Sequence, residues 1–273
     1  MPSSRCAVSL CRARGKKLRD IDLGGKTCLV TGASKGIGAA VARGFADAGA
    51  AVAVHYNSDR EGAEAVVRAI TSQGGKAVAL QGDFSQLGVA GRLVRDSVAA
   101  FGRLDVLVNN AGDMLERRRI AEIDDAFLDH MLALNVRSVI EGCREGVAAF
   151  RRQGGGGAII NVSSIAARTG GGVGSHVYAG CKAFVATFTR SLAKEVASER
   201  IRVNAVAPGI IATPLQARTT PPEQLKAGLA GVPMRRVGEA EECVGAFLYL
   251  ASDRLSGYVT GEVMEVNGGL LMD

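Results

Sequence analysis

The segment Tyr178-Ala179-Gly180-Cys181-Lys182 places a phenol and an amine four residues apart. On a helix, this spacing brings the two side chains to one face. A free tyrosine titrates near pH 10, which is too high for proton exchange at neutral pH. A cation about 4 Å away contributes at most roughly 4 kcal/mol at an effective dielectric constant near 20, so it favours the tyrosinate and lowers the pKa of the phenol. Tyr178 and Lys182 are therefore candidates for general acid–base catalysis.

A second chemical signal is the glycine-rich segment TGASKGIG at residues 31–38. Glycines let a backbone approach a phosphate closely, and a helix that starts there directs N–H groups and a partial positive charge at it. Such a loop alone is weak support, because glycines also serve close packing. Placed between the first strand and the first helix of an α/β pattern, it predicts a dinucleotide site.

The elements that must position these residues alternate between apolar β-branched runs and helical stretches. The predicted strands are 26–31, 51–56, 76–83, 105–112, 158–164, 201–209 and 263–269. The predicted helices are 36–49, 60–75, 91–102, 135–152, 177–197 and 242–252. This alternation predicts a single-domain, doubly wound, Rossmann-type parallel sheet of about seven strands with helices on both faces.

The charge of the chain is concentrated at its start. The 273 residues include 33 Lys and Arg and 27 Asp and Glu, and residues 1–19 hold six of the basic residues and no acid. The rest of the chain is balanced, so a nucleic-acid partner is not expected. We predict a flexible basic extension at 1–24, whose purpose is open and for which a mitochondrial-type presequence is an alternative, and a catalytic domain at 25–273. No apolar run reaches the roughly 18 residues of a membrane span.

Metal binding and secretion are not expected either. The chain has six cysteines without a CxxC pair, and three histidines, which makes a zinc site improbable. Scattered cysteines suit a reducing compartment, so we expect a cytoplasmic protein.

Several motifs then recur in the order of one known family. The glycine spacing G-x-x-x-G-x-G, Asp83 after the third strand, Asn109-Asn110-Ala111-Gly112 after the fourth and P-G-x-x-x-T at 208–213 resemble those of the short-chain dehydrogenase/reductase family. The resemblance covers about residues 25–270. It implies an oxidoreductase with the catalytic tetrad Asn135, Ser164, Tyr178 and Lys182.

The resemblance also implies a role for each member of the tetrad. Tyr178 is the acid in reduction and the base in oxidation, and Lys182 also binds the nicotinamide ribose. Ser164 donates a hydrogen bond to the substrate oxygen, and Asn135 holds a water that links Lys182 to solvent. The implied cofactor contacts are Gly32, Ser34, Lys35, Gly36, Ile37, Gly38, Tyr56, Asn57, Ser58, Asp83, Phe84, Asn110, Ala111, Gly112, Tyr178, Lys182, Pro208, Gly209, Ile211 and Thr213.

The choice between NAD and NADP depends on the end of the second strand. NAD users place a carboxylate there for the ribose 2′-hydroxyl, whereas this chain has Tyr56. Lys35, and Arg60 if it reaches, could face a 2′-phosphate with nearly two negative charges. We expect NADP(H). NAD(H) is the alternative, with Lys35 solvated and Asp59 taking the role of the acid.

Two neighbouring positions leave alternatives open. Ser163 and Ser164 lie fifteen and fourteen residues before Tyr178, and we select Ser164 because it follows Asn161-Val162-Ser163 as the catalytic serine of the family does. His176 could reach the substrate or could be an ordinary loop residue.

The substrate is predicted from sequence segments such as SLAKEVASERIRVNAVAPG, which resemble the corresponding segments of 3-oxoacyl-acyl-carrier-protein reductases. The expected reaction is reduction of a 3-oxoacyl thioester or similar ketone. An acyl carrier protein that carries this substrate is a candidate partner. The alternatives are a sugar, polyol or other small-alcohol dehydrogenase, and a non-catalytic NADP(H)-binding protein. Residues 213–238 are the expected substrate lid, with a mobile loop and a short helix. Candidate residues for docking an acidic carrier are Arg117, Arg118, Arg119, Arg151 and Arg152.

One departure weakens the carrier prediction, because Glu199 stands where such relatives often have a basic residue. The family resemblance also implies a homotetramer that pairs the helices at 135–152 and 177–197 across dimer axes.

Overall fold

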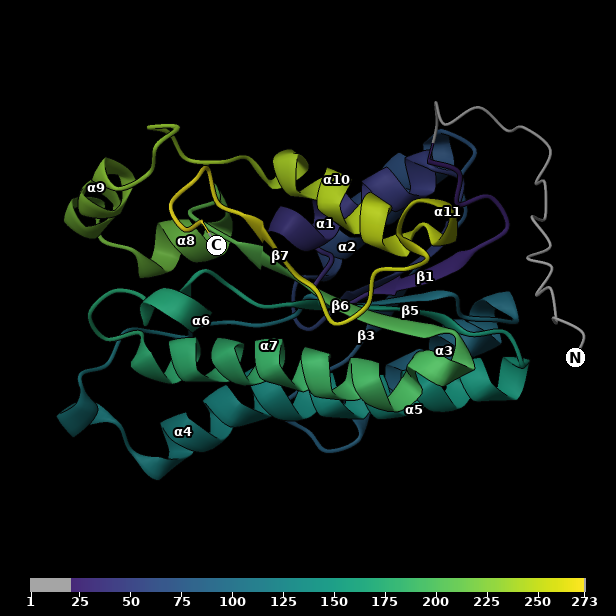
Figure 1. The fold of residues 1–273 in the computed structure, drawn as a ribbon, viewed down its shortest axis with the longest axis horizontal. Coiled ribbons are helices and arrows are strands. Elements are labelled where there is room, and N and C mark those ends of the chain that lie inside the picture. Colours follow the sequence, from purple (N-terminus) through teal and green to yellow (C-terminus); the bar gives the residue numbers. More distant parts are fainter. Residues whose placement is uncertain (1–20, 273) are drawn as a thin grey trace, which may run out of the picture.

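A computed structural model describes residues 21–272 of the chain. Seven parallel strands form one sheet in the order β3-β2-β1-β4-β5-β6-β7 (Figure 1). The strands are β1 (Thr27–Val30), β2 (Ala51–Tyr56), β3 (Ala77–Gln81), β4 (Val106–Asn109), β5 (Gly157–Val162), β6 (Ile201–Pro208) and β7 (Val263–Val266). The predicted doubly wound sheet is confirmed, with every strand at its expected place in the chain.

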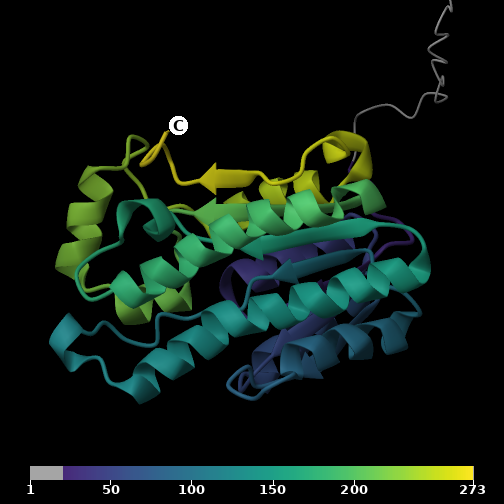
Figure 2. The same ribbon diagram turned by 60° about the horizontal axis from the view of Figure 1, so that its bottom comes forward.

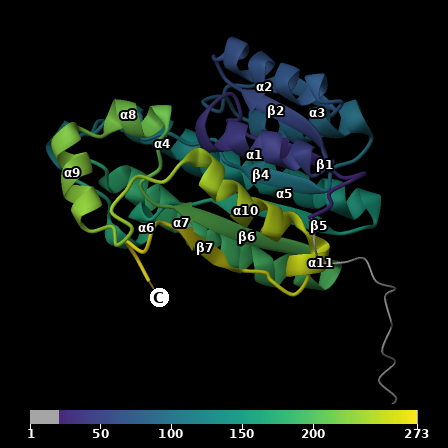
Figure 3. The ribbon, with the colours of Figure 1, turned by 90° about the horizontal axis from the view of Figure 1, so that it is seen from above.

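Helices cover both faces of the sheet, and each face has its own apolar core. On one face lie α1 (Gly36–Asp47), α2 (Arg60–Ser72), α10 (Ala240–Ala251) and the short α11 (Asp253–Ser256) (Figure 3). On the other lie α3 (Val89–Phe101), α5 (Ser138–Gln153) and α7 (His176–Val196), which run along the sheet in Figure 2.

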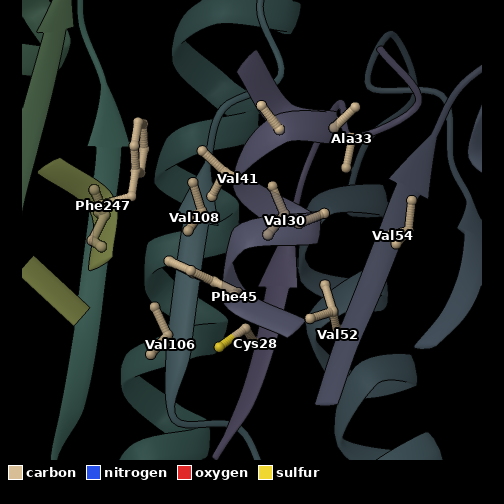
Figure 4. Close-up of a cluster of buried hydrophobic side chains, with 14 of the residues drawn as sticks. Cys28, Val30, Ala33, Val41, Phe45, Val52, Val54, Val106, Val108 and Phe247 are labelled. Carbon is tan, nitrogen blue, oxygen red and sulfur yellow. The ribbon is translucent and has the colours of Figure 1, made fainter. Parts of the chain in front are cut away.

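The alternation of side chains along β1 shows why both faces need cover. Cys28 and Val30 point into the first core and Leu29 into the second, and all three are fully buried, as the period of two along a strand requires. In the first core, Phe45 of α1 and Phe247 of α10 lie against these strands (Figure 4). Burying a side chain of this size stabilises the fold by about 1.5–3 kcal/mol.

Several parts of the chain differ from the prediction. The helix expected at 135–152 is preceded by α4 (Asp125–Leu132), and a π-helical turn at Ala133–Arg137 joins it to α5. The expected lid contains two helices, α8 (Pro214–Thr219) and α9 (Pro222–Ala230). Four short helices were not predicted either: α6 (Ala166–Thr169), α11 and the 3₁₀ turns at Ile120–Glu122 and Ala197–Glu199.

The start of the packed domain also differs. Leu23, within the segment predicted as an extension, is fully buried in the first core and its N–H donates to the carbonyl of Ala48. The packed part of the chain therefore begins before residue 25. The six basic residues of 1–19 lie outside the described residues. No helix in the described part of the chain is long and apolar enough to cross a membrane.

Candidate active site

The predicted site residues meet at the carboxyl ends of the strands. The strand order reverses between β1 and β4, and this reversal opens a crevice at the sheet edge in doubly wound folds. The glycine-rich segment follows β1, and Asn109-Asn110-Ala111-Gly112 ends β4. The start of α7 lies at this same end of the molecule, with α8 and α9 (Figure 1).

Hydrogen bonds tie the glycine-rich segment to the end of β4. The side-chain amide of Asn110 donates to the carbonyls of Thr31 and Gly32 at 2.8 and 3.1 Å, and Thr31 Oγ1 accepts from the N–H groups of Asn110 and Ala111. A Cβ at Gly32 would lie 2.9 Å from Ala111 Cα. Close packing therefore accounts for this glycine.

The second glycine of the segment has a different environment, which fits a phosphate. Gly36 has φ of +57° and opens α1, whose first turn has no acidic residue. A Cβ at Gly36 would meet only the side chains of Thr213 and Pro214, at 3.4 Å or more. Backbone N–H groups and the positive end of α1 thus face a gap bounded by Thr213, an arrangement that suits the pyrophosphate of a dinucleotide.

Tyr178 and Lys182 lie on the first turns of α7, as their spacing predicts. The Tyr178 hydroxyl is hydrogen-bonded to the side chain of Ser164, and Ser164 Oγ accepts from the N–H of Ala166 at 3.1 Å. Lys182 is buried, and its Nζ donates to the carbonyl of Val162 at 2.8 Å and lies 5.5 Å from the centroid of the Tyr178 ring. The structure thus gathers three of the four predicted catalytic side chains around the end of β5.

Asn135 reaches the same place from the π-helical turn. Its Nδ2 donates to the carbonyls of Asp113 and Met131, and its Oδ1 accepts from the N–H of Asp113 at 3.1 Å. A Cβ at Gly112 would lie 2.8 Å from Asn135 Oδ1 and 2.9 Å from Lys182 Nζ. The glycine at 112 therefore lets Asn135 and Lys182 approach the backbone from two sides. Local π-helical turns often occur at functional sites.

The pKa of Tyr178 beside Lys182 differs from the value expected from the sequence. Burial, with a smaller contribution from the negative charge of Asp113, raises the pKa of Tyr178 to about 12, against the lowering effect of the hydrogen bond to Ser164. Burial lowers the pKa of Lys182 to about 8. The expected lowering of the tyrosine pKa is wrong for this structure, because burial of the phenol dominates and the Lys182 Nζ is hydrogen-bonded to the Val162 carbonyl. At neutral pH the phenol is protonated and the amine is mostly charged.

The two adjacent serines point in different directions. Ser163 Oγ donates to the carbonyl of Lys182 at 2.9 Å and is 2% exposed. Ser164 keeps part of its surface and lies beside Tyr178. His176 is exposed on the first turn of α7. Of the two candidate serines, only Ser164 has its hydroxyl at the tyrosine.

The end of β2 carries the groups expected to select the cofactor. The buried Tyr56 accepts a hydrogen bond from Arg60 Nε at 3.2 Å, and Lys35 lies 3.8 Å from Asp59. The Asp59 carboxylate also caps α2, since it accepts from the N–H of Gly62. Asn57 and Ser58 follow β2 at this edge. The end of β2 is therefore surrounded by two cations, Lys35 and Arg60, and by the carboxylate of Asp59.

The remaining predicted cofactor residues lie at the same edge. Asp83 accepts from the N–H of Ser85, which lowers its pKa, and Phe84 is buried beside it. Gly209 packs against Asn267, Ile211 pairs with Gly238, and Thr213 caps α8. The others on this edge are Ser34 and Ile37 in the glycine-rich segment, Gly38 beside Asn110, and Pro208 at the end of β6.

Comparisons with known proteins agree with this geometry. The family profile described as enoyl-(acyl carrier protein) reductase matches residues 32–271. A 3-oxoacyl-[acyl-carrier-protein] reductase of Synechocystis is 38% identical over 252 residues, covering 90% of this chain and 97% of that protein. A solved double mutant of a Serratia marcescens short-chain dehydrogenase/reductase is 36% identical, with a TM-score of 0.84 and coverage of 91% and 98%. The chain belongs to the short-chain dehydrogenase/reductase family.

Members of this family are oxidoreductases that bind a nicotinamide cofactor. A further solved structure is described as a putative NAD(P)-dependent gluconate 5-dehydrogenase from Beutenbergia cavernae with bound NADP. It is 35% identical, with a TM-score of 0.85, and covers 92% of this chain and 98% of that one. The predicted resemblance to this family and to 3-oxoacyl-acyl-carrier-protein reductases is confirmed. The relatives differ in substrate, so the family alone does not choose one.

Two of the predicted docking arginines lie away from the site. Arg151 is in the last turn of α5 and forms an ion pair with Glu199 at 2.7 Å, and Arg152 pairs with Glu145. The helix has sixteen residues, so this end is about 24 Å from the end near Asn135. Within one protomer, these two arginines are not at the mouth of the site.

Sequence reasoning missed three residues with defined roles in the architecture of the site. His55 of β2 accepts from the N–H of Gly32 at 2.9 Å and lies 3.0 Å from the carbonyl of Gly82. Asp113 and Arg218 form an ion pair between the end of β4 and α8. A histidine inside an otherwise apolar strand was a usable signal for His55, but no local pattern pairs residues 113 and 218.

Proposed function

We propose that this protein transfers a hydride between NADP(H) and a ketone or secondary alcohol. The hydrogen bond between Tyr178 and Ser164, with Lys182 one helical turn behind, carries the proposal. This is the arrangement that the Tyr–Lys spacing predicts for acid–base work on a substrate oxygen. A complete set of Asn135, Ser164, Tyr178 and Lys182 argues against a protein that only binds the cofactor, since binding alone does not need it.

The chain's own residues supply the proton chemistry of the reduction. Ser164 donates to the carbonyl oxygen of the substrate, and the protonated phenol of Tyr178 gives its proton to that oxygen as it gains negative charge. The charged Lys182 then stabilises the tyrosinate. Asn135 fixes the backbone of Asp113 through two hydrogen bonds, and a third joins its side chain to the carbonyl of Met131. The bound nicotinamide supplies the hydride in this direction and accepts it in the reverse one.

The two cations near the end of β2 support NADP(H) over NAD(H). Asp59 caps α2 and pairs with Lys35, so it is committed to the protein rather than free for a ribose hydroxyl. Lys35 is 59% exposed and can turn toward a 2′-phosphate, with which a cation forms a charge-assisted bond.

The cofactor preference is tested by comparing kcat/KM for NADPH and NADH. We expect a preference of at least about tenfold for NADPH, as for one charge-assisted hydrogen bond. Lys35→Ala should reduce this preference, and Lys76→Ala should not, because Lys76 is exposed before β3 at the other edge of the sheet. Equal efficiencies in the wild-type protein would contradict the preference.

Two substrate classes remain from the sequence, a 3-oxoacyl thioester and a small hydroxylated ketone or alcohol. Two of the five candidate docking arginines, Arg151 and Arg152, lie far from the site, and Arg117 and Arg118 are bonded to groups of the protein itself, which favours the second class. We also propose a cytoplasmic location, in keeping with four described cysteines that are all free and buried.

The substrate class is tested by a turnover panel of acetoacetyl thioesters, ketones and polyols. Activity with hydroxylated ketones or polyols supports our choice. Activity confined to the thioester would return the assignment to a 3-oxoacyl reductase.

A further inference from the structure

An ionic contact joins the segment after β4 to α8 near the catalytic residues. Arg218 of α8 places Nη2 2.5 and 2.6 Å from the two carboxylate oxygens of Asp113. Asp113 directly follows Gly112, whose backbone lies against Lys182, and its negative charge acts on Tyr178. The Asp113–Arg218 pair therefore lies within electrostatic reach of the reacting groups.

The carboxylate of Asp113 is held in place independently of Arg218. Its Oδ1 accepts from the N–H of Leu115 at 2.7 Å, and its backbone is bonded on both sides to Asn135. Leu115 has φ of +58°, a left-handed conformation that is strained by roughly 1–3 kcal/mol in a residue other than glycine. A strained turn that fixes one carboxylate in a cleft points to a use for that carboxylate.

A second arginine crosses the gap in the opposite direction. Arg117 Nε donates to the carbonyl of Thr219 at 2.6 Å, Nη2 to Thr220 Oγ1, and Nη1 to the carbonyl of Val173 at 3.0 Å. Arg117 thus binds the end of α8 to the loop after β4. With α8 held by Arg117, loss of the Asp113–Arg218 pair alone would not free the helix.

The cleft between these segments has charged, polar and apolar side chains in its lining. It has a volume of about 500 Å³ and includes the side chains of Glu116, Arg117, Arg218, Thr219 and Thr220 as well as Leu115 and three small or cyclic residues. The charged side chains of Glu116, Arg117 and Arg218 on this rim suit a polar substrate group better than an extended acyl chain, which needs an apolar lining. A substrate hydroxyl group matches the Asp113–Arg218 pair, because a hydroxyl can donate to a carboxylate and accept from a guanidinium at once.

We propose that Asp113 and Arg218 are specificity-determining residues that select a substrate with a hydroxyl group beside the reacting carbon. The hydroxyl donates to Asp113 and accepts from Arg218, and the adjacent carbonyl lies at Ser164 and Tyr178. The substrate class is then an α-hydroxyketone, or the corresponding vicinal diol in oxidation. This inference rests on the proposed hydride transfer and adds its substrate class.

The test compares three NADPH-dependent reductions, of 2-hydroxycyclohexanone, cyclohexanone and an acetoacetyl thioester. The first two probes differ only in one hydroxyl group. We expect kcat/KM to favour the hydroxyketone by roughly tenfold or more, the effect of one hydrogen bond to a charged group. Asp113→Asn and Arg218→Ala should each reduce this ratio at least about fivefold, within the range of such a bond. Arg218 is half exposed on its helix, so Arg218→Ala leaves the core intact. This second variant keeps the test valid if Asp113→Asn does not fold.

The control removes the charge from a comparable aspartate–arginine pair elsewhere. Asp96→Asn breaks the contact of Asp96 with Arg92 at 2.8 Å on α3 and should leave the ratio unchanged. NADPH affinity, measured by nucleotide fluorescence, should be the same in all these proteins. The inference would be overturned by a hydroxyketone-to-ketone ratio of kcat/KM near one, or by a ratio that neither Asp113→Asn nor Arg218→Ala changes. It would also be overturned if the thioester were reduced tenfold better than the hydroxyketone. No turnover of any probe by a protein that binds NADPH would overturn the proposed function as well.

Discussion

At the scale of single residues, Ser163 and Ser164 separate structure from chemistry. Ser163 bonds the carbonyl of Lys182 inside the protein, and Ser164 bonds the Tyr178 hydroxyl at the cleft. The sequence placed both serines before the tyrosine but could not orient them. Both serines follow the last residue of β5, so the direction of each side chain depends on contacts with α7, which the local sequence does not show.

This difference gives opposite expectations for two alanine variants. Ser164→Ala removes a donor to the developing oxyanion and should lower kcat by about 10²–10³, with little change in the urea midpoint. Ser163→Ala leaves a buried carbonyl with one partner fewer and should lower the free energy of unfolding by about 1–2 kcal/mol while kcat stays within a few-fold. Loss of turnover in Ser163→Ala alone would show that the catalytic serine was wrongly chosen.

The buried Lys182 should make stability depend on pH. Its pKa is lowered from 10.5 to about 8 in the folded protein, so below pH 8 both states carry the proton and the full penalty of burying the charge applies. Between pH 8 and 10.5 the unfolded chain binds more protons than the folded one, and stability rises with pH. The urea midpoint of the wild type, relative to that of Lys182→Met, should therefore increase from pH 7.5 to 9.5. A constant or falling difference would contradict the burial argument.

At the scale of secondary-structure elements, His55 joins three strand ends. It is 2% exposed, its Nδ1 accepts from Gly32 after β1, its Nε2 bonds the Gly82 carbonyl after β3, and its ring stacks on Phe84 at 4.6 Å. Burial lowers its pKa to about 4, so it is neutral and keeps the acceptor that Gly32 needs. His55 thus joins the glycine-rich segment to the predicted cofactor contacts after β3, Asp83 and Phe84.

Replacing His55 should weaken cofactor binding more than catalysis. His55→Leu leaves a buried donor at Gly32 and an acceptor at Gly82 unpaired, each at about 1–3 kcal/mol. We expect a lower unfolding midpoint and an NADPH dissociation constant raised by roughly tenfold, the equivalent of about 1.4 kcal/mol, with kcat at saturating cofactor within a few-fold. Phe84→Leu, which removes the stacking and keeps both hydrogen bonds, is the control and should change the dissociation constant less. An unchanged dissociation constant in His55→Leu would limit His55 to packing.

The sequence predicts a structural feature when the pattern that causes it lies within one short segment of the chain. All seven strands follow from apolar runs of four to eight residues, because both faces of the sheet are covered, although the edge strands β3 and β7 are only partly buried. The π-helical turn that presents Asn135 has no sequence signature, since it differs from an α-helix only in its hydrogen bonds. Arg218 and Asp113 are 105 residues apart, so their contact depends on how α8 folds back, and no pattern within either segment reveals it.

At the scale of the whole molecule, the long helices leave apolar side chains exposed. Phe184 on α7 is 40% exposed, and Leu132 at the end of α4, just before the turn that leads into α5, is 41% exposed. The family resemblance implies pairing between protomers through the helices at 135–152 and 177–197, and Phe184 lies on the second of them. We expect a tetramer by light scattering at micromolar concentration, and a smaller species for Phe184→Glu, because a charge in an apolar interface is strongly unfavourable. A wild-type monomer would contradict this expectation.

The central claim is that Tyr178 is the acid of a hydride-transfer site. It is tested most directly by measuring kcat and NADPH affinity of the wild type and Tyr178→Phe with the substrate that the panel identifies. Removal of one hydroxyl group should lower kcat by about 10³-fold, within the usual 10²–10⁴ for general acid–base catalysis, while the NADPH dissociation constant stays within threefold. A Tyr178→Phe protein that keeps a tenth or more of the wild-type kcat would contradict the claim.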